Sequence, residues 1–267
     1  MKMTEQNSYE RITHNWRAGL SNLLDFEIAH WWKTRRWWLQ SLIWIIVVNG
    51  SIAAMALVVL PLTLPPTEQS TLNPSQLIPL YVEGIGFFGP LGIILLMHGV
   101  VVSERQSGVT AWILSKPVSR STYVMSKFVG NALGILFSVV FLPGVIAYVM
   151  LSLGFVGSWL SFGFLAALAL IALEALFYIA FTIMLGTLFR QPIPVLAVGI
   201  GFFLSQQILI MAFPFLFDFL PISLSKALFM PVALYQQLPT IIPIVANLVW
   251  ISLWISIAVW RFSKEEF

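Results

Sequence analysis

Six stretches of almost unbroken apolar residues alternate with short polar segments along the chain. The hydrocarbon core of a bilayer requires about 20 apolar residues in a helix, and each stretch is of that length. The apolar residues run continuously and do not alternate with polar ones, which favours helices over a β-barrel. The pattern therefore predicts an all-α membrane protein with six transmembrane helices, at residues 38–60, 80–102, 128–153, 162–189, 193–216 and 241–260.

Composition agrees with this prediction, and the distribution of charge predicts how the chain is oriented in the membrane. Hydrophobic residues make up 59% of the 267 positions and charged residues only 9%, which is too little polar surface for a soluble globule of this size. Of the 14 lysines and arginines, all but Lys226 fall in alternate inter-span segments or near the termini. By the positive-inside rule we expect those segments and both termini to be cytoplasmic, in the inner membrane of a bacterium. Membrane orientation explains the positive charge, and we expect no nucleic-acid partner.

The segment before the first span has a helical pattern of its own. Between Leu20 and Trp32 apolar residues recur at helical spacing, with polar residues on the other side. We therefore predict a short cytoplasmic lead with an interfacial elbow helix at residues 1–37, followed by a six-helix transmembrane domain at residues 38–267. The elbow helix either only anchors the chain to lipid or also contacts a cytoplasmic partner. Aromatic and cationic side chains that suit the headgroup layer are Trp31, Trp32, Lys33, Arg35 and Arg36.

A long polar segment that is dense in positive charge, residues 103–127, separates the second and third spans. Within it, residues 108–115 can form a short helix that carries Trp112. Pro117 stops that helix, and one of the serines that follow can cap the next. A short helix with an exposed tryptophan is suited to a groove on another protein, whereas the plainer interpretation is a solvated connection.

The order of residues in this segment favours the first interpretation. Glu104-Arg105 and Gly108, followed by the run Pro117-Val118-Ser119-Arg120, stand after the second of six spans. This arrangement resembles the type-2 ABC transporter permeases, the membrane subunits of ATP-driven exporters. The resemblance implies a coupling helix that docks on a separate cytoplasmic ATPase subunit, and a second permease chain, identical or paralogous. The residues that it assigns to coupling are Glu104, Arg105, Gly108, Trp112, Pro117 and Arg120.

Catalytic chemistry is not expected in this chain. The sequence contains no G-x-x-x-x-G-K-[ST] phosphate-binding loop, so ATP and Mg²⁺ are expected on the partner ATPase and no cofactor on this chain. It has no cysteine and three histidines, without the spacing of a metal or haem site. We therefore expect no metal, no catalytic residues and no enzymatic activity of its own.

A second unusual segment precedes the last span, at residues 217–240. It is too polar and too rich in proline to cross the membrane, yet it is more apolar than a solvated loop. We predict short helices that dip into the outer leaflet and are broken at Pro221, Pro231 and Pro239. This arrangement is similar to the external re-entrant helices of the same permeases; the alternative is a hydrophobic loop that lies on the bilayer.

Within the fourth span, Glu174, Tyr178 and Thr182 recur every four residues and form a polar stripe on one helix face. Ionisable residues are costly inside a membrane, which makes them candidates for function. The stripe either lines the translocation path or the dimer seam, or it makes structural hydrogen bonds to a neighbouring helix. Glu174 is also the residue that supports the alternative function, a secondary transporter driven by an ion gradient.

Overall fold

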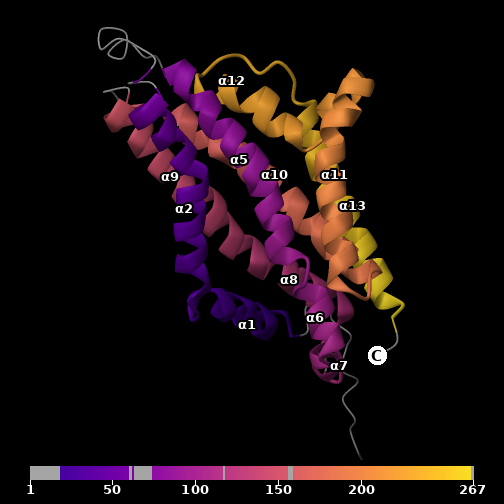
Figure 1. Ribbon diagram of the computed structural model, residues 1–267. Coiled ribbons are helices and arrows are strands. Elements are labelled where there is room, and N and C mark those ends of the chain that lie inside the picture. Colours follow the sequence, from indigo (N-terminus) through magenta and orange to yellow (C-terminus); the bar gives the residue numbers. More distant parts are fainter. Residues whose placement is uncertain (1–18, 60–61, 63–73, 117, 156–158, 266–267) are drawn as a thin grey trace, which may run out of the picture.

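The computed structural model describes residues 19–59, 62, 74–116, 118–155 and 159–265, and its regular structure over these residues is entirely helical. Six helices are long and apolar enough to cross a membrane, which confirms the predicted fold class. They pack as a bundle with their long axes roughly side by side (Figure 1). The spans are Arg36–Val59, Leu77–Gln106, Arg120–Leu153, Phe162–Leu188, Pro192–Ala212 and Ile242–Ser263.

Several spans are built from more than one helical segment. The third span begins as an α-helix and passes through two stretches of wider π-helix, the first of which ends shortly before Pro143. The first three spans contain α2 (Arg36–Ala54) with η1 (Met55–Val59), α5 (Pro74–Met97) with α6 (Val100–Gln106), and α8 (Arg120–Ile135) with η2 (Leu136–Phe141), α9 (Leu142–Val149) and η3 (Met150–Phe155). The last three are α10 (Phe162–Leu188), α11 (Pro192–Ala212) and α13 (Ile242–Ser263).

The fourth span, α10, is the centre of the bundle. It packs against α5, α8 and α13, and it is the most buried of the six spans, whereas most residues of α11 and α13 are half-buried or exposed. The fifth span is shorter than predicted, because α11 ends at Ala212 and not at residue 216. Pro214 lacks a backbone N–H and forces Phe213 out of the helical conformation, so a separate 3₁₀ turn, η4 (Pro214–Phe219), follows.

Two short helices follow η4, at the end of the bundle opposite the C-terminus (Figure 1). They are η5 (Leu224–Leu228) and α12 (Phe229–Ala233), and they form one continuous apolar segment. The predicted break at Pro231 is wrong, because the helix continues from η5 through this proline and ends at Ala233. Gly163 lets α12 lie on α10, since a Cβ there would be 2.5 Å from the carbonyl oxygen of Val232.

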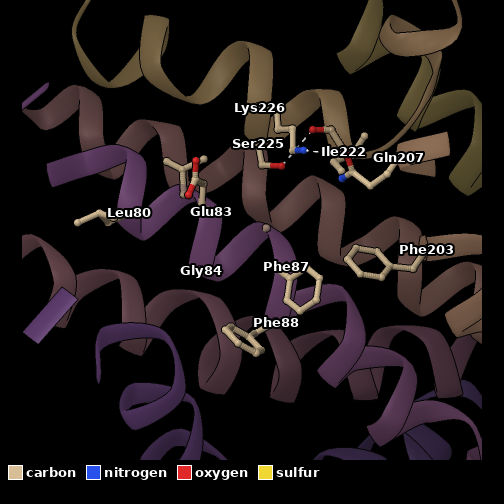
Figure 2. A pocket seen from close by; sticks show the side chains of 12 residues that line it. Leu80, Glu83, Gly84, Phe87, Phe88, Phe203, Gln207, Ile222, Ser225 and Lys226 are labelled. Carbon is tan, nitrogen blue, oxygen red and sulfur yellow. Dashed lines mark hydrogen bonds between the residues drawn. The ribbon is translucent and has the colours of Figure 1, made fainter. Parts of the chain in front are cut away.

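A pocket of about 470 Å³ lies at the same end, between α5, α11 and η5 (Figure 2). At the other end, α1 (Leu20–Trp32) lies across the bundle instead of along it and packs on α8, and the short helix α7 (Val109–Leu114) lies at the same end (Figure 1). The two ends of the bundle therefore carry different features: the polar segment between the second and third spans at one, and the pocket at the other.

Candidate functional site

The connection between α6 and α7 is a tight turn centred on Gly108. This residue adopts a left-handed conformation, with a φ of 76°, which favours glycine because a side chain would strain the backbone. No other atom lies within 4 Å of the position that a Cβ would occupy, so conformation and not space requires the glycine. The turn sets α7 off from the long helix before it.

The short helix α7 has a buried side and an exposed side. Thr110 and Ile113 are buried against the bundle, whereas the side chain of Trp112 is 63% exposed. The ammonium of Lys116 lies 3.5 Å from the centre of the Trp112 ring, a cation–π contact at the outer surface of α7. An exposed tryptophan held in this way, beside a partly exposed Val109, offers a compact apolar contact point to another protein.

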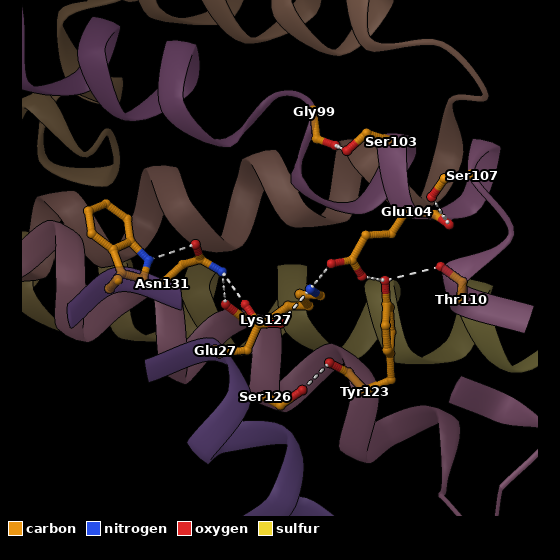
Figure 3. A network of polar contacts seen from close by, with 11 residues as sticks. Glu27, Gly99, Ser103, Glu104, Ser107, Thr110, Tyr123, Ser126, Lys127 and Asn131 are labelled. Atoms are coloured by element: carbon orange, nitrogen blue, oxygen red, sulfur yellow. Dashed lines mark hydrogen bonds and ion pairs between the residues drawn. The ribbon is translucent and has the colours of Figure 1, made fainter. Parts of the chain in front are cut away.

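Behind α7 lies a buried network of charges that joins three helices (Figure 3). Lys127 of α8 is 3% exposed and forms ion pairs with both Glu27 of α1 and Glu104 of α6. A buried ammonium is stable only when paired, and here two carboxylates share it. Burial raises the pKa of Glu27, and the attraction of Lys127 opposes this effect only in part.

Tyr123 extends this network to α7 and α13. Its hydroxyl donates a hydrogen bond of 2.7 Å to Glu104 Oε2 and lies 3.2 Å from Thr110 Oγ1 of α7. Its ring is stacked on that of Phe262 near the end of α13, with the centroids 5.0 Å apart and the planes only 5° from parallel. A displacement of α7 would therefore disturb contacts to α6, α8 and α13 together.

The helix α1 is held against α8 by a notch of two glycines. A Cβ at Gly130 would be 2.3 Å from the Cβ of Glu27, and one at Gly134 would be 2.1 Å from the Trp31 ring. The indole N–H of Trp31 donates a hydrogen bond of 3.1 Å to Asn131 Oδ1 in the same notch. Small residues at i and i+4 thus allow close packing of α1 on the third span.

The two arginines predicted for coupling bind within the chain. Arg105 donates hydrogen bonds to the carbonyl oxygens of Gly186 and Phe189 at the end of α10, and it forms an ion pair with Glu265. Arg120 donates a hydrogen bond to the carbonyl oxygen of Ser263. Cations near helix C-termini satisfy the last carbonyl groups, so these arginines tie the polar segment to the ends of the fourth and sixth spans.

The predicted coupling residues are thus brought together at one end of the bundle. The exception is Pro117, which lies outside the described residues. Among the predicted interfacial anchors, Trp32, Lys33, Arg35 and Arg36 are exposed. Trp31 was wrongly grouped with them: it is 3% exposed, because the Gly134 notch receives its ring.

Sequence reasoning missed Glu27, Lys127 and Asn131 as members of this site. A signal was present, because Glu27 falls between Leu23 and Trp31 at four-residue spacing, on the apolar side of α1. Lys127 and Asn131 are likewise four residues apart and flank Gly130. A charged residue within an apolar face, and a second one beside a small-residue notch, are features of a buried pair.

The polar stripe on α10 lies elsewhere, in the middle of the bundle. Tyr178 accepts a hydrogen bond of 2.7 Å from Gln206 Nε2 of α11, and Thr182 donates one of 2.7 Å to the Tyr178 carbonyl oxygen. Glu174 is 2% exposed, and its polar neighbours are Ser225 and the ammonium of Lys226, both in η5. All three side chains are buried within the protomer in this conformation, so a role in the translocation path or dimer seam stays a prediction.

Comparison with known proteins identifies the class. The family model for the ABC-2 family transporter protein matches residues 21–267, so the chain belongs to this family. This confirms the resemblance to type-2 ABC transporter permeases and makes the chain a multi-pass membrane transporter permease. A relative is the uncharacterized transmembrane protein YxlG of Bacillus subtilis (strain 168), which is 32% identical over 150 residues. These residues make up 54% of this chain and 57% of the relative, so the chain spans little more than half of the relative's length.

Proposed function

We propose that this permease is the membrane subunit of an ATP-driven exporter and that α7 is the contact point for a separate cytoplasmic ATPase. The observation that carries the proposal is the exposed Trp112, which stands on a helix whose other side is bound into the bundle. Binding of a partner at α7 would affect more than this helix, because Thr110 and Tyr123 connect α7 to the charge network.

The network supplies a route by which such a contact acts on the bundle. Movement of α7 changes the position of Glu104 relative to Lys127, and through Lys127 the position of Glu27 in α1. Arg105 connects the same segment to the end of α10. A partner shifts the equilibrium between two conformations only if it contacts them differently, so the ATPase must bind α7 more tightly in one state.

Further parts of the proposal follow from membership of the family. ATP and Mg²⁺ belong to the partner ATPase, and two permease chains, identical or paralogous, assemble over two ATPases. The lysine- and arginine-rich end with α1, α7 and the last turn of α13 faces the cytoplasm. Transport is outward, through a path formed by the permease chains.

A second candidate function is a transporter driven by an ion gradient. The observation that favours it is Glu174, a carboxyl group buried in the fourth span. Intramembrane acids of this kind occur in proton relays of secondary transporters.

A pull-down of the tagged chain from native membranes, with identification of partners and an ATPase assay, distinguishes the ATP-driven exporter from the gradient-driven transporter. We expect a P-loop ATPase in the wild-type eluate and its loss with Trp112→Ala. The matched control is Trp260→Ala, because Trp260 is 57% exposed and also has a lysine, Lys264, over its ring at 4.0 Å. ATPase recovered equally from all three chains would refute α7 as the contact point. A functional chain that copurifies with no ATPase would favour the gradient-driven transporter.

A further inference from the structure

The pocket between α5, α11 and η5 combines an apolar wall with two opposite charges. Its volume of about 470 Å³ lies in the range of ligand sites. Aromatic rings line it from two sides, Phe87 and Phe88 on α5 and Phe203 on α11 (Figure 2). The carboxylate of Glu83 and the ammonium of Lys226 line the same pocket from α5 and η5.

These two charges do not neutralise each other. No ion pair joins Glu83 to Lys226 within the described parts of the chain, and the acidic group that the charge of Lys226 acts on is the buried Glu174 of α10. The ammonium of Lys226 instead donates a hydrogen bond of 3.2 Å to Gln207 Oε1, a neutral acceptor. Both side chains are exposed where they line the pocket. Separated opposite charges on the wall of one pocket match a ligand that carries both signs.

Lys226 lies apart from the other basic residues of the chain. Every other described lysine or arginine lies toward the end of the bundle that holds α1, α7 and the C-terminal end of α13. A lone cation at the opposite end contributes nothing to the charge asymmetry that orients a membrane protein, and it opposes that asymmetry. Its position is explained if it binds an anionic group.

We propose that this pocket binds a zwitterionic glycerophospholipid with a primary ammonium in its headgroup, of the phosphatidylethanolamine type. Lys226 and the amide of Gln207 hold the phosphate, and Glu83 accepts hydrogen bonds from the ammonium. One acyl chain lies against the rings of Phe87, Phe88 and Phe203. This site is separate from α7 and does not depend on the ATPase contact.

The proposed chemistry makes the pocket selective among membrane lipids. A primary ammonium donates hydrogen bonds to a carboxylate, whereas the quaternary ammonium of phosphatidylcholine has no N–H to donate. Phosphatidylglycerol carries no cation at all, so it would leave Glu83 unpaired. We therefore expect phosphatidylethanolamine to be retained in preference to both.

Native mass spectrometry of the full chain, released from nanodiscs with equal amounts of the three lipids, measures this preference. Loss of one charge-assisted contact should lower phosphatidylethanolamine retention roughly tenfold in Glu83→Gln and in Lys226→Gln. The matched control is Asp218→Asn, which removes a charge from η4 at the same end without touching the pocket, and it should retain the lipid like the wild type. Equal retention of all three lipids, or equal retention by the variants and the control, would overturn the proposal.

A second experiment uses the unmodified chain and so does not depend on the folding of variants. A phosphatidylethanolamine with a photoreactive diazirine in its acyl chain should label peptides that contain Phe87, Phe88 or Phe203. Excess unlabelled phosphatidylethanolamine should compete, whereas free phosphoethanolamine should not, because it lacks the acyl chain. Competition by the free headgroup would assign the pocket to a soluble zwitterion, and labelling of other helices alone would refute the site.

Discussion

Glu27 of α1 and Lys127 of α8 form a buried ion pair across 100 positions of sequence. Glu104 of α6 shares the same ammonium, so one lysine holds α1, the second span and the third span together. The pair lies directly behind the helix that carries Trp112. The stability of the protein should therefore depend on this pair and on the glycine notch beside it.

Replacing Lys127 by methionine should destabilise the protein strongly. The change leaves two carboxylates without their partner, and breaking a buried ion pair in this way costs about 3–5 kcal/mol. Thermal unfolding in detergent measures the effect, with the exposed Lys33→Met as the control. The double variant Glu27→Gln/Lys127→Met should recover part of the loss. An unfolding temperature unchanged by Lys127→Met would show that the network carries no stability.

Stability should depend on pH through Glu27. Burial raises the pKa of this carboxyl group above its usual value of 4.5, so the folded state holds the proton more tightly than the unfolded state. The contribution is therefore fully present below pH 4.5 and is lost as the pH rises through the folded-state pKa. The unfolding temperature of the wild type relative to Glu27→Gln should fall over that range. The exposed Asp25→Asn should show no such trend, and a difference that grows with pH would contradict the prediction.

Filling the glycine notch should displace α1. At Gly134 a Cβ would be 2.1 Å from the Trp31 ring, and overpacking of this kind costs about 1–3 kcal/mol. Gly134→Ala should lower the unfolding temperature and speed hydrogen exchange of the α1 amides. Gly201→Ala is the control, because nothing lies within 4 Å of its Cβ position. Equal exchange rates in both variants would show that α1 does not depend on the notch.

The left-handed conformation of Gly108 should limit which residues can replace it. Asparagine tolerates a positive φ and a β-branched residue does not, so Gly108→Asn should keep partner binding and Gly108→Val should lose it. Copurified ATPase activity measures the outcome, while membrane abundance shows whether insertion is intact. Loss of abundance in Gly108→Val would make the turn a folding element and not a docking element.

Two substitutions of Glu174 distinguish its roles. Because the carboxyl group is buried and glutamine has the same shape and still offers an acceptor oxygen, Glu174→Gln should be accommodated at unchanged abundance. If Glu174 lies on the translocation path, Glu174→Gln and Glu174→Leu should both lower transport. Thr187→Val is the control, since this buried hydroxyl of α10 lies outside the stripe and donates a hydrogen bond to the Met184 carbonyl oxygen of its own helix. Transport retained by both Glu174 variants would exclude the path.

The sequence by itself determined the class of protein and the number of spans. Length and hydrophobicity decide whether a helix can cross a bilayer, and neither depends on how helices pack. It also located the segment that contains α7, because a polar stretch between apolar runs must leave the membrane. Helix ends were less certain where a proline interrupts an apolar run, as Pro214 does after α11.

Only the tertiary structure decided which residues meet. The burial of Glu27 and Trp31 depends on Gly130 and Gly134, about 100 positions away, and helix periodicity cannot identify such a partner. The direction of the Glu174 stripe was also undetermined, because α10 is apolar on nearly every side and its pattern marks no outer face. A periodic pattern shows which residues share a helix face, whereas only packing shows what that face contacts.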